Sequence, residues 1–411
     1  MNKKKIFNDP VYGFITIPGQ HIYDIIEHPF FQRLRRIKQL GLTDFVYPGA
    51  LHTRFHHALG AMHLMTKALD TLRSKGVMIF EAEYEAAQMA ILLHDIGHGP
   101  FSHTLEFSLF KNVNHEQISL WIFKKLNAEF GGRLELAIQI FTGKYHRKFL
   151  HQLVSSQLDA DRLDYLRRDS FFTGVMEGTI GSERIIKMLN VVDDQLVVEE
   201  KGMYSIENFL NARRLMYWQV YLHKASVSAE SILISLMKRA KRLTQTGANI
   251  QATPALKIFL EQDITAEEFQ KDHDLLDVFG MLDDTDIWGS IKFWAQHDDF
   301  VLKTLSNSLL RRKLFKIELS NEKISTERIN DLKSSLIKSG INQSDVKYFV
   351  QKGMVSNAAY IVKDSSINIL TKSGEVVDVA SATDLPNIKA ISKIVKKYYL
   401  SYPKDIYLRA T

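Results

Sequence analysis

Apolar residues recur at three- and four-residue spacings along most of the first 245 residues of the chain. This spacing is the period of one face of an α-helix, and Gly or Pro residues stand near the ends of the segments. The pattern predicts helices at residues 22–40, 55–75, 83–96, 115–130, 150–168 and 206–242. Between the last two helices, residues 194–205 predict a short hairpin with its turn at residues 201 and 202.

The pattern changes after residue 245. Three more helices are predicted at 250–262, 265–279 and 285–306, and alternating apolar residues then predict strands at 312–319, 346–351 and 358–364. A hairpin with its turn at 372–374 is predicted at 367–380, and a last helix at 388–400. We therefore expect a mainly α protein, with a large helical domain in residues 1–245 and a smaller C-terminal α+β domain in residues 246–411. The boundary between the two falls within residues 245–310.

Composition narrows the class of protein. Hydrophobic residues make up 45% of the 411 residues and charged residues 24%, which is typical of a globular protein rather than a disordered or fibrous one. Cysteine is absent, which excludes a disulfide scaffold, a Cys-ligated metal site and a thiol nucleophile. No apolar run approaches the roughly 20 residues that cross a bilayer, and no secretory signal follows the basic N-terminus, so we expect a cytoplasmic protein without a membrane partner. The net charge of +6 permits a polyanionic partner such as a nucleotide or nucleic acid.

Histidine is the residue type that points to chemistry, because 8 of the 15 histidines lie within residues 52–115. In ILLHDIGHGPFSH at 91–103, His94 and Asp95 end a helix that is apolar on most sides, where a charged group is costly unless it is paired or binds a metal. His98 follows His94 by four residues and is expected to project from the same side. A hydrogen-bonded core residue is the alternative for any single histidine, but the clustering favours a metal site.

A metal ion needs more ligands than one dipeptide provides. The candidates before it are His56 and His57, and those after it are the acidic residues of SSQLDADRLDYLRRD at 155–169. In that segment one helical face carries Asp161, Asp164, Tyr165, Arg168 and Asp169. A solvated helix face with Asp–Arg pairs is the alternative interpretation of this segment. Two imidazoles and two carboxylates suit Mn, Fe, Zn, Ni or Mg, and such a site favours phosphate-ester hydrolysis.

In this order, His57, the pair His94–Asp95, and Asp161 resemble the H…HD…D signature of the HD-superfamily metal-dependent phosphohydrolases. A wider set of motifs is similar to the deoxynucleoside triphosphate triphosphohydrolases, including the vertebrate enzyme that joins a sterile alpha motif to an HD domain. These motifs are NDPVYG at 8–13, FQRLRRIKQLG at 31–41, YPGALHTRFHHALG at 47–60, HDIGHGPFSH at 94–103, NHEQ at 114–117, DADRLDYLRRD at 159–169 and YLHK at 221–224. The resemblance covers about the first 245 residues, without the sterile alpha motif, and predicts an HD-domain helical core.

The resemblance implies one divalent metal ion in each active site, bound by His57, His94, Asp95 and Asp161. It also implies hydrolysis at the α-phosphorus, which releases a deoxynucleoside and intact triphosphate. This chemistry needs a proton donor for the leaving 5′-oxygen, and the available residues are His98, His103 and His115, with Glu106 one turn from His103. The sequence does not rank these three histidines.

The substrate contacts follow from the same resemblance. The phosphate chain is expected to meet Arg54, Arg162 and Arg213, where Arg162 replaces a Lys of the vertebrate enzyme and adds a bidentate fork. The 3′-hydroxyl is expected to meet Gln39 and Asp169, and the deoxyribose to pack against Leu40, Tyr165 and Tyr221. Without the resemblance, Tyr221 would be interpreted as ordinary aromatic core.

Regulation is a separate hypothesis. In the vertebrate enzyme a guanine nucleotide binds between subunits, at positions that match Lys5, Asn8, Glu27, Gln32 and Arg35, and Glu27 replaces an Asp. We therefore expect a homo-oligomer, a dimer or tetramer, with an activating nucleotide; a solvated helix face is the alternative for the basic residues at 33–38.

Two further functions stay open at this point. One is an HD phosphohydrolase that acts on nucleoside monophosphates or other phosphoesters. The other is a non-catalytic regulator that binds nucleotides or nucleic acid through the basic stretches at 33–38, 238–242 and 311–316.

Overall fold

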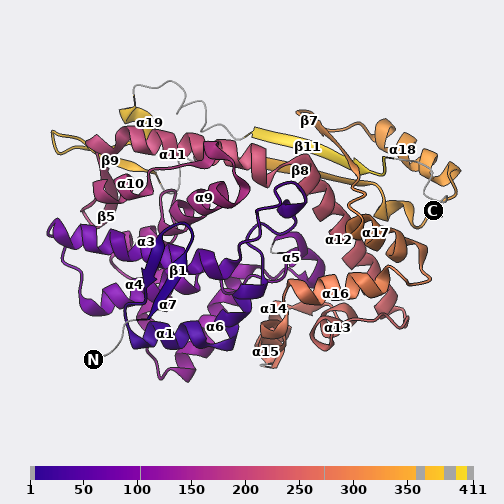
Figure 1. Ribbon diagram of the computed structural model, residues 1–411, viewed down its shortest axis with the longest axis horizontal. Helices are drawn as coiled ribbons and strands as arrows, with labels where there is room; N and C mark the ends of the chain where they lie inside the picture. Colours follow the sequence, from indigo (N-terminus) through magenta and orange to yellow (C-terminus); the bar gives the residue numbers. More distant parts are fainter. Residues whose placement is uncertain (1–4, 102, 273, 358–365, 384–394, 405–411) are drawn as a thin grey trace.

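The computed structural model of the protein describes residues 5–101, 103–272, 274–357, 366–383 and 395–404, except for the side chains of His103, Phe107 and Asn357. Helices dominate, and small sheets lie among them (Figure 1), so the expectation of a mainly α fold with a smaller C-terminal α/β region is confirmed. The part of the chain before residue 175 contains β1 (Ile6–Asp9), β2 (Gly13–Thr16), α1 (Gln20–Glu27), α2 (Pro29–Gln32), η1 (Arg33–Arg36), η2 (Thr43–Phe45), α3 (Arg54–Ser74), α4 (Glu81–Leu93), α5 (His103–Leu109), β3 (Phe110–Lys111), α6 (His115–Glu129), α7 (Glu135–Phe141), α8 (Lys148–Val154) and α9 (Ala160–Thr173).

The middle of the chain continues with helices, a hairpin and one π-helical turn, which is η5. These elements are η3 (Met176–Gly178), α10 (Ser182–Met188), β4 (Leu189–Val192), β5 (Gln195–Glu199), η4 (Glu200–Gly202), α11 (Met203–Met216), η5 (Tyr217–Tyr221), α12 (Lys224–Gln245), α13 (Pro254–Glu261), β6 (Ile264–Thr265), α14 (Ala266–Lys271), α15 (Asp274–Met281), α16 (Asp284–Trp294) and α17 (Phe300–Leu310). The C-terminal part contains β7 (Lys316–Ser320), α18 (Thr326–Lys338), η6 (Val346–Tyr348), β8 (Gln351–Asn357), β9 (Asn368–Leu370), β10 (Val376–Asp378), α19 (Val379–Ala382) and β11 (Val395–Tyr402).

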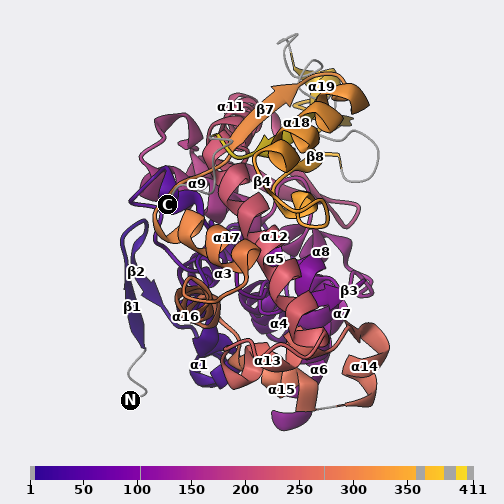
Figure 2. The ribbon, with the colours of Figure 1, turned by 90° about the vertical axis from the view of Figure 1, so that its right-hand side faces the viewer.

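The helix α3 lies at the centre of the N-terminal part, where it contacts α4, α9 and α10. Most of its residues are buried around the whole circumference, as expected for a helix with apolar residues on every side. The helix α12 contacts α5, α13, α17 and β7, and it runs through the middle of the molecule in Figure 2. These two helices therefore form the frame to which the N-terminal and C-terminal elements attach.

Five predicted helices are interrupted in the structure. The prediction at 22–40 divides into α1, α2 and η1, because Pro29 lacks the N–H of a helix interior and His28 before it is extended. The prediction at 150–168 divides into α8 and α9, because the side chain of Asp159 caps α9 by accepting the backbone N–H of Arg162. The long helix expected at 206–242 breaks after η5, where His223 caps α12.

The fourth interruption separates α16 from α17, where the side chain of Asp299 caps the second helix. The prediction at 265–279 likewise corresponds to two short helices, α14 and α15. Periodicity alone did not reveal these breaks, because the apolar spacing continues across each cap.

The hairpin expected at 194–205 exists, but its turn was predicted in the wrong place. β4 pairs with β5 antiparallel, and the turn falls at Asp193 and Asp194, which have φ of 48° and 62°. Asp tolerates this left-handed conformation better than most residues do, so the Asp–Asp pair was the signal for the turn. The predicted turn residues lie in η4 instead.

Two sheets contain the C-terminal strands. The strand order of the first is β10-β9-β5-β4, where β9 pairs with β5 in parallel, so residues 368–370 join a sheet begun by residues 189–199. The second has the order β7-β11-β8, with β11 paired antiparallel to both neighbours. The first sheet therefore spans the domain boundary expected from the sequence.

Three C-terminal predictions need comment. The expected strand at 346–351 is wrong, because 346–348 form η6 and the strand begins at 351. The expected helix at 388–400 is wrong over 395–400, which lie in β11, and its first residues lie outside the described part of the chain, as does the strand expected at 358–364. The hairpin at 367–380 is confirmed, with Gly374 at φ 88° in its turn.

Candidate metal centre and substrate site

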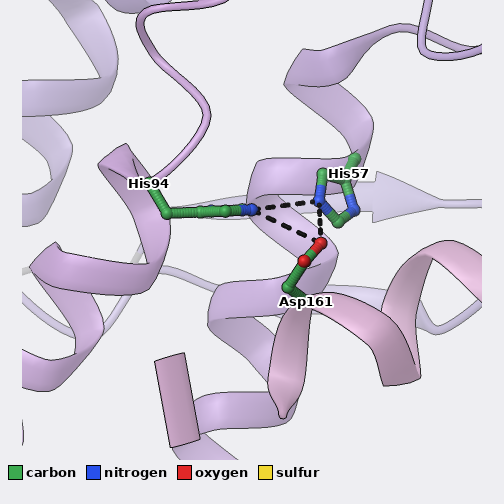
Figure 3. A group of neighbouring side chains, drawn as sticks. All are labelled: His57, His94 and Asp161. Atoms are coloured by element: carbon green, nitrogen blue, oxygen red, sulfur yellow. Dashed lines mark hydrogen bonds and ion pairs between the residues drawn. The ribbon is translucent and has the colours of Figure 1, made fainter. Parts of the chain in front are cut away.

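Three side chains, two within helices and one directly after a helix, converge at one point (Figure 3). His57 stands in the first turn of α3, His94 directly follows α4, and Asp161 is the second residue of α9. The Nε2 atom of His57 lies 3.4 Å from Nε2 of His94 and 3.1 Å from Oδ1 of Asp161. Nε2 of His94 lies 3.5 Å from the same carboxylate oxygen. The packing of α3 between α4 and α9 creates this meeting point.

These separations fit a single metal ion. Ligand nitrogen and oxygen atoms at about 2.0–2.2 Å from one ion are themselves about 3.0–3.5 Å apart. Two imidazole nitrogens and one carboxylate oxygen are donors that Zn, Fe, Ni and Mn accept. His57 is fully buried, and the three donors therefore form a preassembled centre rather than a surface cluster.

Both imidazole rings are held in the orientation that a ligand needs. Nδ1 of His57 is bonded to Oδ2 of Asp164 at 2.8 Å, and Nδ1 of His94 is bonded to the carbonyl of Ile91 at 2.6 Å. Such outer contacts fix the tautomer and aim Nε2 at the ion. Burial lowers the pKa of His57, but hydrogen bonds to Asp161 and Asp164 outweigh it and raise the pKa to about 10.

A buried ionic network stands behind His57. The carboxylate of Asp164 also accepts Nε and Nη2 of Arg168, at 2.9 and 3.0 Å, and Arg168 donates onward to Asp9 at 2.7 Å. A Cβ on Gly60 would lie 2.1 Å from Oδ1 of Asp164, so this position in α3 has no room for a side chain. Asp164 therefore supports His57, a candidate metal ligand. The place of Asp164 on the acidic helix face did not distinguish this role from direct ligation.

Asp95 lies beside the group formed by His57, His94 and Asp161. Its Oδ2 is paired with the guanidinium of Arg54, and its Oδ1 lies 3.4 Å from Nε2 of His94 and 3.3 Å from Nε2 of His98. Burial would raise the pKa of Asp95, but His94, Arg54 and His98 hold it well below its ordinary value. The expected ligand Asp95 thus lies next to the three-donor group as an ionised carboxylate.

The histidines expected to handle protons lie beside this carboxylate. The rings of His98 and His115 are stacked with centroids 3.9 Å apart, and both line a small pocket. Glu106 accepts the backbone N–H of His115 at 2.9 Å and faces its Nδ1 at 3.3 Å. The third candidate, His103, begins α5, and its side chain lies outside the described part of the structure.

Arginines and tyrosines form the wall on the other side of Asp161. Arg162 is paired with Asp159 and lies 4.0 Å from Asp161. Arg213 donates to Gln157 at 2.8 Å. Burial, and then the nearby Tyr217, raise the pKa of Tyr165, while Arg213 and Arg162 lower it less. Arg162 and Arg213 therefore lie near enough to Tyr165 to act electrostatically on its hydroxyl.

Tyr217 is a member of this wall that the sequence did not indicate. Its ring lies 5.1 Å from that of Tyr221, and Tyr221 lies 6.1 Å from Tyr165. Tyr217 and Tyr221 are the two ends of the π-helical turn η5, and such turns often occur at functional sites. The four-residue spacing within an aromatic run was the available signal.

Asp169 is the polar group of the tyrosine wall. Tyr221 donates its hydroxyl to Oδ2 at 2.8 Å, and Nε2 of His52 is bonded to Oδ1 at 2.7 Å. The backbone N–H of Gln39 donates to the carbonyl of His52 at 3.0 Å, which brings residue 39 to the same place. Leu40, the next residue, is partly buried against the core. His52 was not among the predicted site residues, although it lies in the histidine-rich stretch.

The residues expected to bind an activating nucleotide lie on or near the N-terminal hairpin and the first helices. Lys5, Asn8, Glu27 and Arg35 are exposed, and Lys5 lies over the ring of Tyr23 at 4.6 Å. Gln32 is half-buried and accepts Nε of Arg35 at 2.8 Å.

Two family descriptions match consecutive parts of the chain. The HD domain matches residues 54–169, and the HD associated region matches residues 180–254. The first match contains all of the converging metal-ligand candidates. Among the helices that the structure describes, none combines the length and apolarity needed to cross a membrane.

Solved structures and proteins from several organisms are similar to this chain. A crystal structure of a phosphohydrolase from Bacteroides thetaiotaomicron has a TM-score of 0.94 and 56% identity, and the match covers 97% of this chain and 100% of that one. The protein YwfO of Bacillus subtilis is 32% identical over 99% of this chain and 94% of its own length. A deoxynucleoside triphosphate triphosphohydrolase, the SAMHD1 homolog of Dictyostelium discoideum, is 31% identical over 60% of this chain and 51% of its own length. The chain therefore spans about half of the length of this last relative.

Proposed function

Because the chain belongs to the HD-superfamily phosphohydrolases, we propose that it hydrolyses deoxynucleoside triphosphates to a deoxynucleoside and triphosphate. The observation that carries this proposal is the position of Arg162. Its guanidinium lies 4.0 Å from the candidate ligand Asp161 and next to the tyrosine wall. A nucleotide sugar on the tyrosines would thus have its first phosphate beside the metal centre.

Unused hydrogen-bonding atoms support a polar ligand in this region. Oε1 of Gln39, Nε of Arg162 and Nε of Arg213 are buried and have no hydrogen-bond partner among the described residues. Buried polar atoms are normally paired, so each such atom calls for a ligand or a water. All three atoms named above belong to residues that are expected to contact the phosphates or the sugar. Their lack of partners therefore agrees with a nucleotide ligand, which has a charged phosphate chain and a sugar with hydroxyl groups.

Separate groups of side chains bind the phosphate chain and the sugar. Arg162 and Arg213 offset the charge of the phosphate chain, and Arg54 acts from the side of Asp95. Asp169 accepts a sugar hydroxyl while Tyr165 and Tyr221 pack against the ring. A ribose 2′-hydroxyl would meet this aromatic wall, which accounts for a preference for deoxynucleotides.

A divalent ion in the centre would polarise a phosphoryl oxygen and activate water. His57, His94 and Asp161 are the residues that hold it, with Asp95 as the fourth candidate. The proton for the leaving 5′-oxygen comes from the group His98, His103 and His115, in which Glu106 holds His115 in place.

Activation by a guanine nucleotide or a dNTP, in a dimer or tetramer, is the regulatory part of the proposal. The exposure of Lys5, Asn8, Glu27 and Arg35 leaves them accessible to a ligand shared with a second subunit. Added GTP is expected to raise the rate, and the activity of Arg35→Ala should lose that response.

The test is a substrate panel with product identification. Purified protein is incubated with each dNTP and Mg²⁺ or Mn²⁺, with and without GTP, and products are separated by ion-exchange chromatography. Deoxynucleoside together with intact triphosphate supports the proposal. Monophosphate or free phosphate alone would replace the reaction, and turnover of nucleoside monophosphates only would favour the broader phosphohydrolase activity.

The nucleic-acid-binding alternative finds less support, since its basic stretches are largely engaged within the protein. Partners within the chain are found for Arg36 (Asp283), Lys38 (Asp44), Arg239 (Asp299 and Asp345), Lys241 (Asp263) and Arg312 (the Phe45 carbonyl). A salt-dependent affinity for DNA or RNA without turnover of any nucleotide would reverse this preference.

A further inference from the structure

The segment at residues 96–101, which we call the catalytic loop, follows Asp95 and carries His98. Two side chains from distant parts of the sequence hold its backbone at both ends. Arg33, in η1, donates Nη2 to the carbonyls of Ile96 and His98 at 2.8 and 2.9 Å. Asp284, the first residue of α16, accepts the backbone N–H of Phe101 at 3.0 Å.

Arg33 is an unusual residue to find in the core. Its exposed fraction is 0%, it makes no ion pair with a described carboxylate, and it stacks on the ring of Phe279 at 4.6 Å. Its other terminal nitrogen, Nη1, donates to the carbonyl of Leu282 at 3.1 Å. Burying a guanidinium that makes no direct ion pair is costly, and its three hydrogen bonds to carbonyls, two of them in the loop, offset that cost.

Asp284 ties the catalytic loop to the candidate substrate residues. Its second oxygen accepts the backbone N–H of Lys38 at 2.9 Å, immediately before Gln39. Phe101 has a φ of 52°, a left-handed conformation that a bulky residue adopts only when its surroundings enforce it. One buried carboxylate therefore fixes both a strained residue of the loop and the segment that carries a sugar-contact candidate.

As a consequence, the side chain of His98 is held in one orientation. Its carbonyl is held by Arg33, and its ring is stacked on His115 with Nε2 3.3 Å from Asp95. Between the two anchors, Gly97 donates its N–H to Oγ of Ser119 at 2.9 Å. The loop is thereby held from η1, α6 and α16 at once.

Residues 33–38 and 282–284 lie outside both regions that match the HD descriptions, 54–169 and 180–254. The two anchors are 251 positions apart in sequence, and neither contacts the converging donors His57, His94 and Asp161 in the described structure. Their role is therefore separable from metal binding.

We propose that Arg33 and Asp284 are positioning residues that hold the catalytic loop so that His98 faces the reacting phosphate. This inference rests on the proposed function for its kinetic part. It assigns to the part of the chain beyond residue 254 a supporting role at the active site, through a single carboxylate at the start of α16.

The test compares Asp284→Asn and Arg33→Lys with the control Asp286→Ala. Asn keeps the shape of Asp but presents an amide to one of the two N–H donors. Lys keeps the charge of Arg but replaces the rigid planar fork, whose two terminal nitrogens hold three carbonyls, with a single ammonium on a flexible stem. Asp286 accepts the N–H of Asp283 at 2.7 Å and so supports the same helix start without touching the loop.

Four quantities are measured: kcat, KM, Mn²⁺ affinity, and hydrogen exchange at the Phe101 amide. In Asp284→Asn and Arg33→Lys, kcat is expected to fall about 10- to 100-fold, because small misplacements of reacting groups have effects of that size. KM and Mn²⁺ affinity should stay within twofold, and the Phe101 amide should exchange faster. In the control, kcat and exchange at Phe101 should match the wild type after correction for the folded fraction.

Two results would overturn the inference: unchanged exchange at Phe101 in Asp284→Asn, or faster exchange with an unchanged kcat. If the wild type hydrolyses another phosphoester instead of dNTPs, kcat and KM are measured with that phosphoester. Failure of the proposed function can thus be told apart from failure of this inference. If the wild type turns over no substrate, the exchange rate of the Phe101 amide decides alone. Equal rates in Asp284→Asn and Asp286→Ala overturn the inference, and a faster rate in Asp284→Asn only supports the anchoring.

Discussion

The support of His57 by Asp164 leads to a prediction about metal affinity. In Asp164→Asn the amide oxygen can still accept Nδ1–H of His57, but the negative charge that strengthens this ligand is lost. Changes to such outer contacts reduce metal affinity by about 10- to 100-fold, which corresponds to about 1.4–2.8 kcal/mol. The weaker binding should appear in titrations with Mn²⁺ followed by calorimetry.

The same substitution also perturbs the fold, and the structure gives the size of that effect. Arg168 is fully buried and would keep Asp9 as its remaining ionic partner. Removing one partner of a buried ion pair costs about 3–5 kcal/mol, and the retained Asp9 contact and the amide hydrogen bond bring the expected loss below that range, to about 2–3 kcal/mol. Urea unfolding in the presence of a chelator measures this loss without the contribution of bound metal.

A matched control separates the two effects. Asp299→Asn removes the charge that pairs with Arg239, at 2.5 Å between α12 and the residue that caps α17, and neither residue contacts the candidate metal ligands in the described structure. It should lower stability while leaving Mn²⁺ affinity unchanged. The reasoning is refuted if Asp164→Asn binds Mn²⁺ as tightly as the wild type, or if both variants weaken binding equally.

Three other predictions concern separate parts of the molecule. Asp161→Ala should abolish both tight metal binding and phosphohydrolysis, as measured by elemental analysis and the substrate panel; retention of one equivalent of metal would contradict the centre. Gly60→Ala forces a Cβ to within 2.1 Å of Asp164, so the free energy of unfolding should fall by about 1–3 kcal/mol. Burial raises the pKa of Glu230 to about 7, above its ordinary value of 4.5, so the folded state favours the neutral form and loses stability as the pH rises from about 4.5 to 7. Glu230→Gln should therefore raise the Tm at pH 8 by an amount equivalent to at most about 3 kcal/mol, with little change at pH 4.5, and equal shifts at both pH values would contradict this assignment.

The predictable part of the site is the part that local spacing controls. His94 and Asp95 are adjacent at the end of α4, so both stay near one point, and Asp161 and Asp164 lie at positions i and i+3 of α9, so they share one face of that helix. The helices α3, α4 and α6 follow from apolar periodicity for the same reason. The assignment of Asp164 to His57 instead of the ion depends on where α3 crosses α9, which spacing alone does not determine.

The less predictable part depends on partners distant in sequence. The segment 395–400 has apolar and aromatic residues at spacings that suit either a helix or a strand, and it becomes β11 because β7 and β8 flank it on both sides. The roles of Arg33 and Asp284 have the same origin, since no local pattern links a buried arginine to loop carbonyls 63 and 65 residues further along.

The parallel pairing of β5 with β9 bears on how the protein folds as it is synthesised. Val197 lies beside Asn368, about 170 residues later, so β5 has an unpaired edge until most of the chain has left the ribosome. An exposed strand edge is a site of misassembly between chains. Fragments that end near residue 245 should therefore aggregate, and the slow step of refolding should be the arrival of residues 368–370 at this edge rather than formation of the helical core.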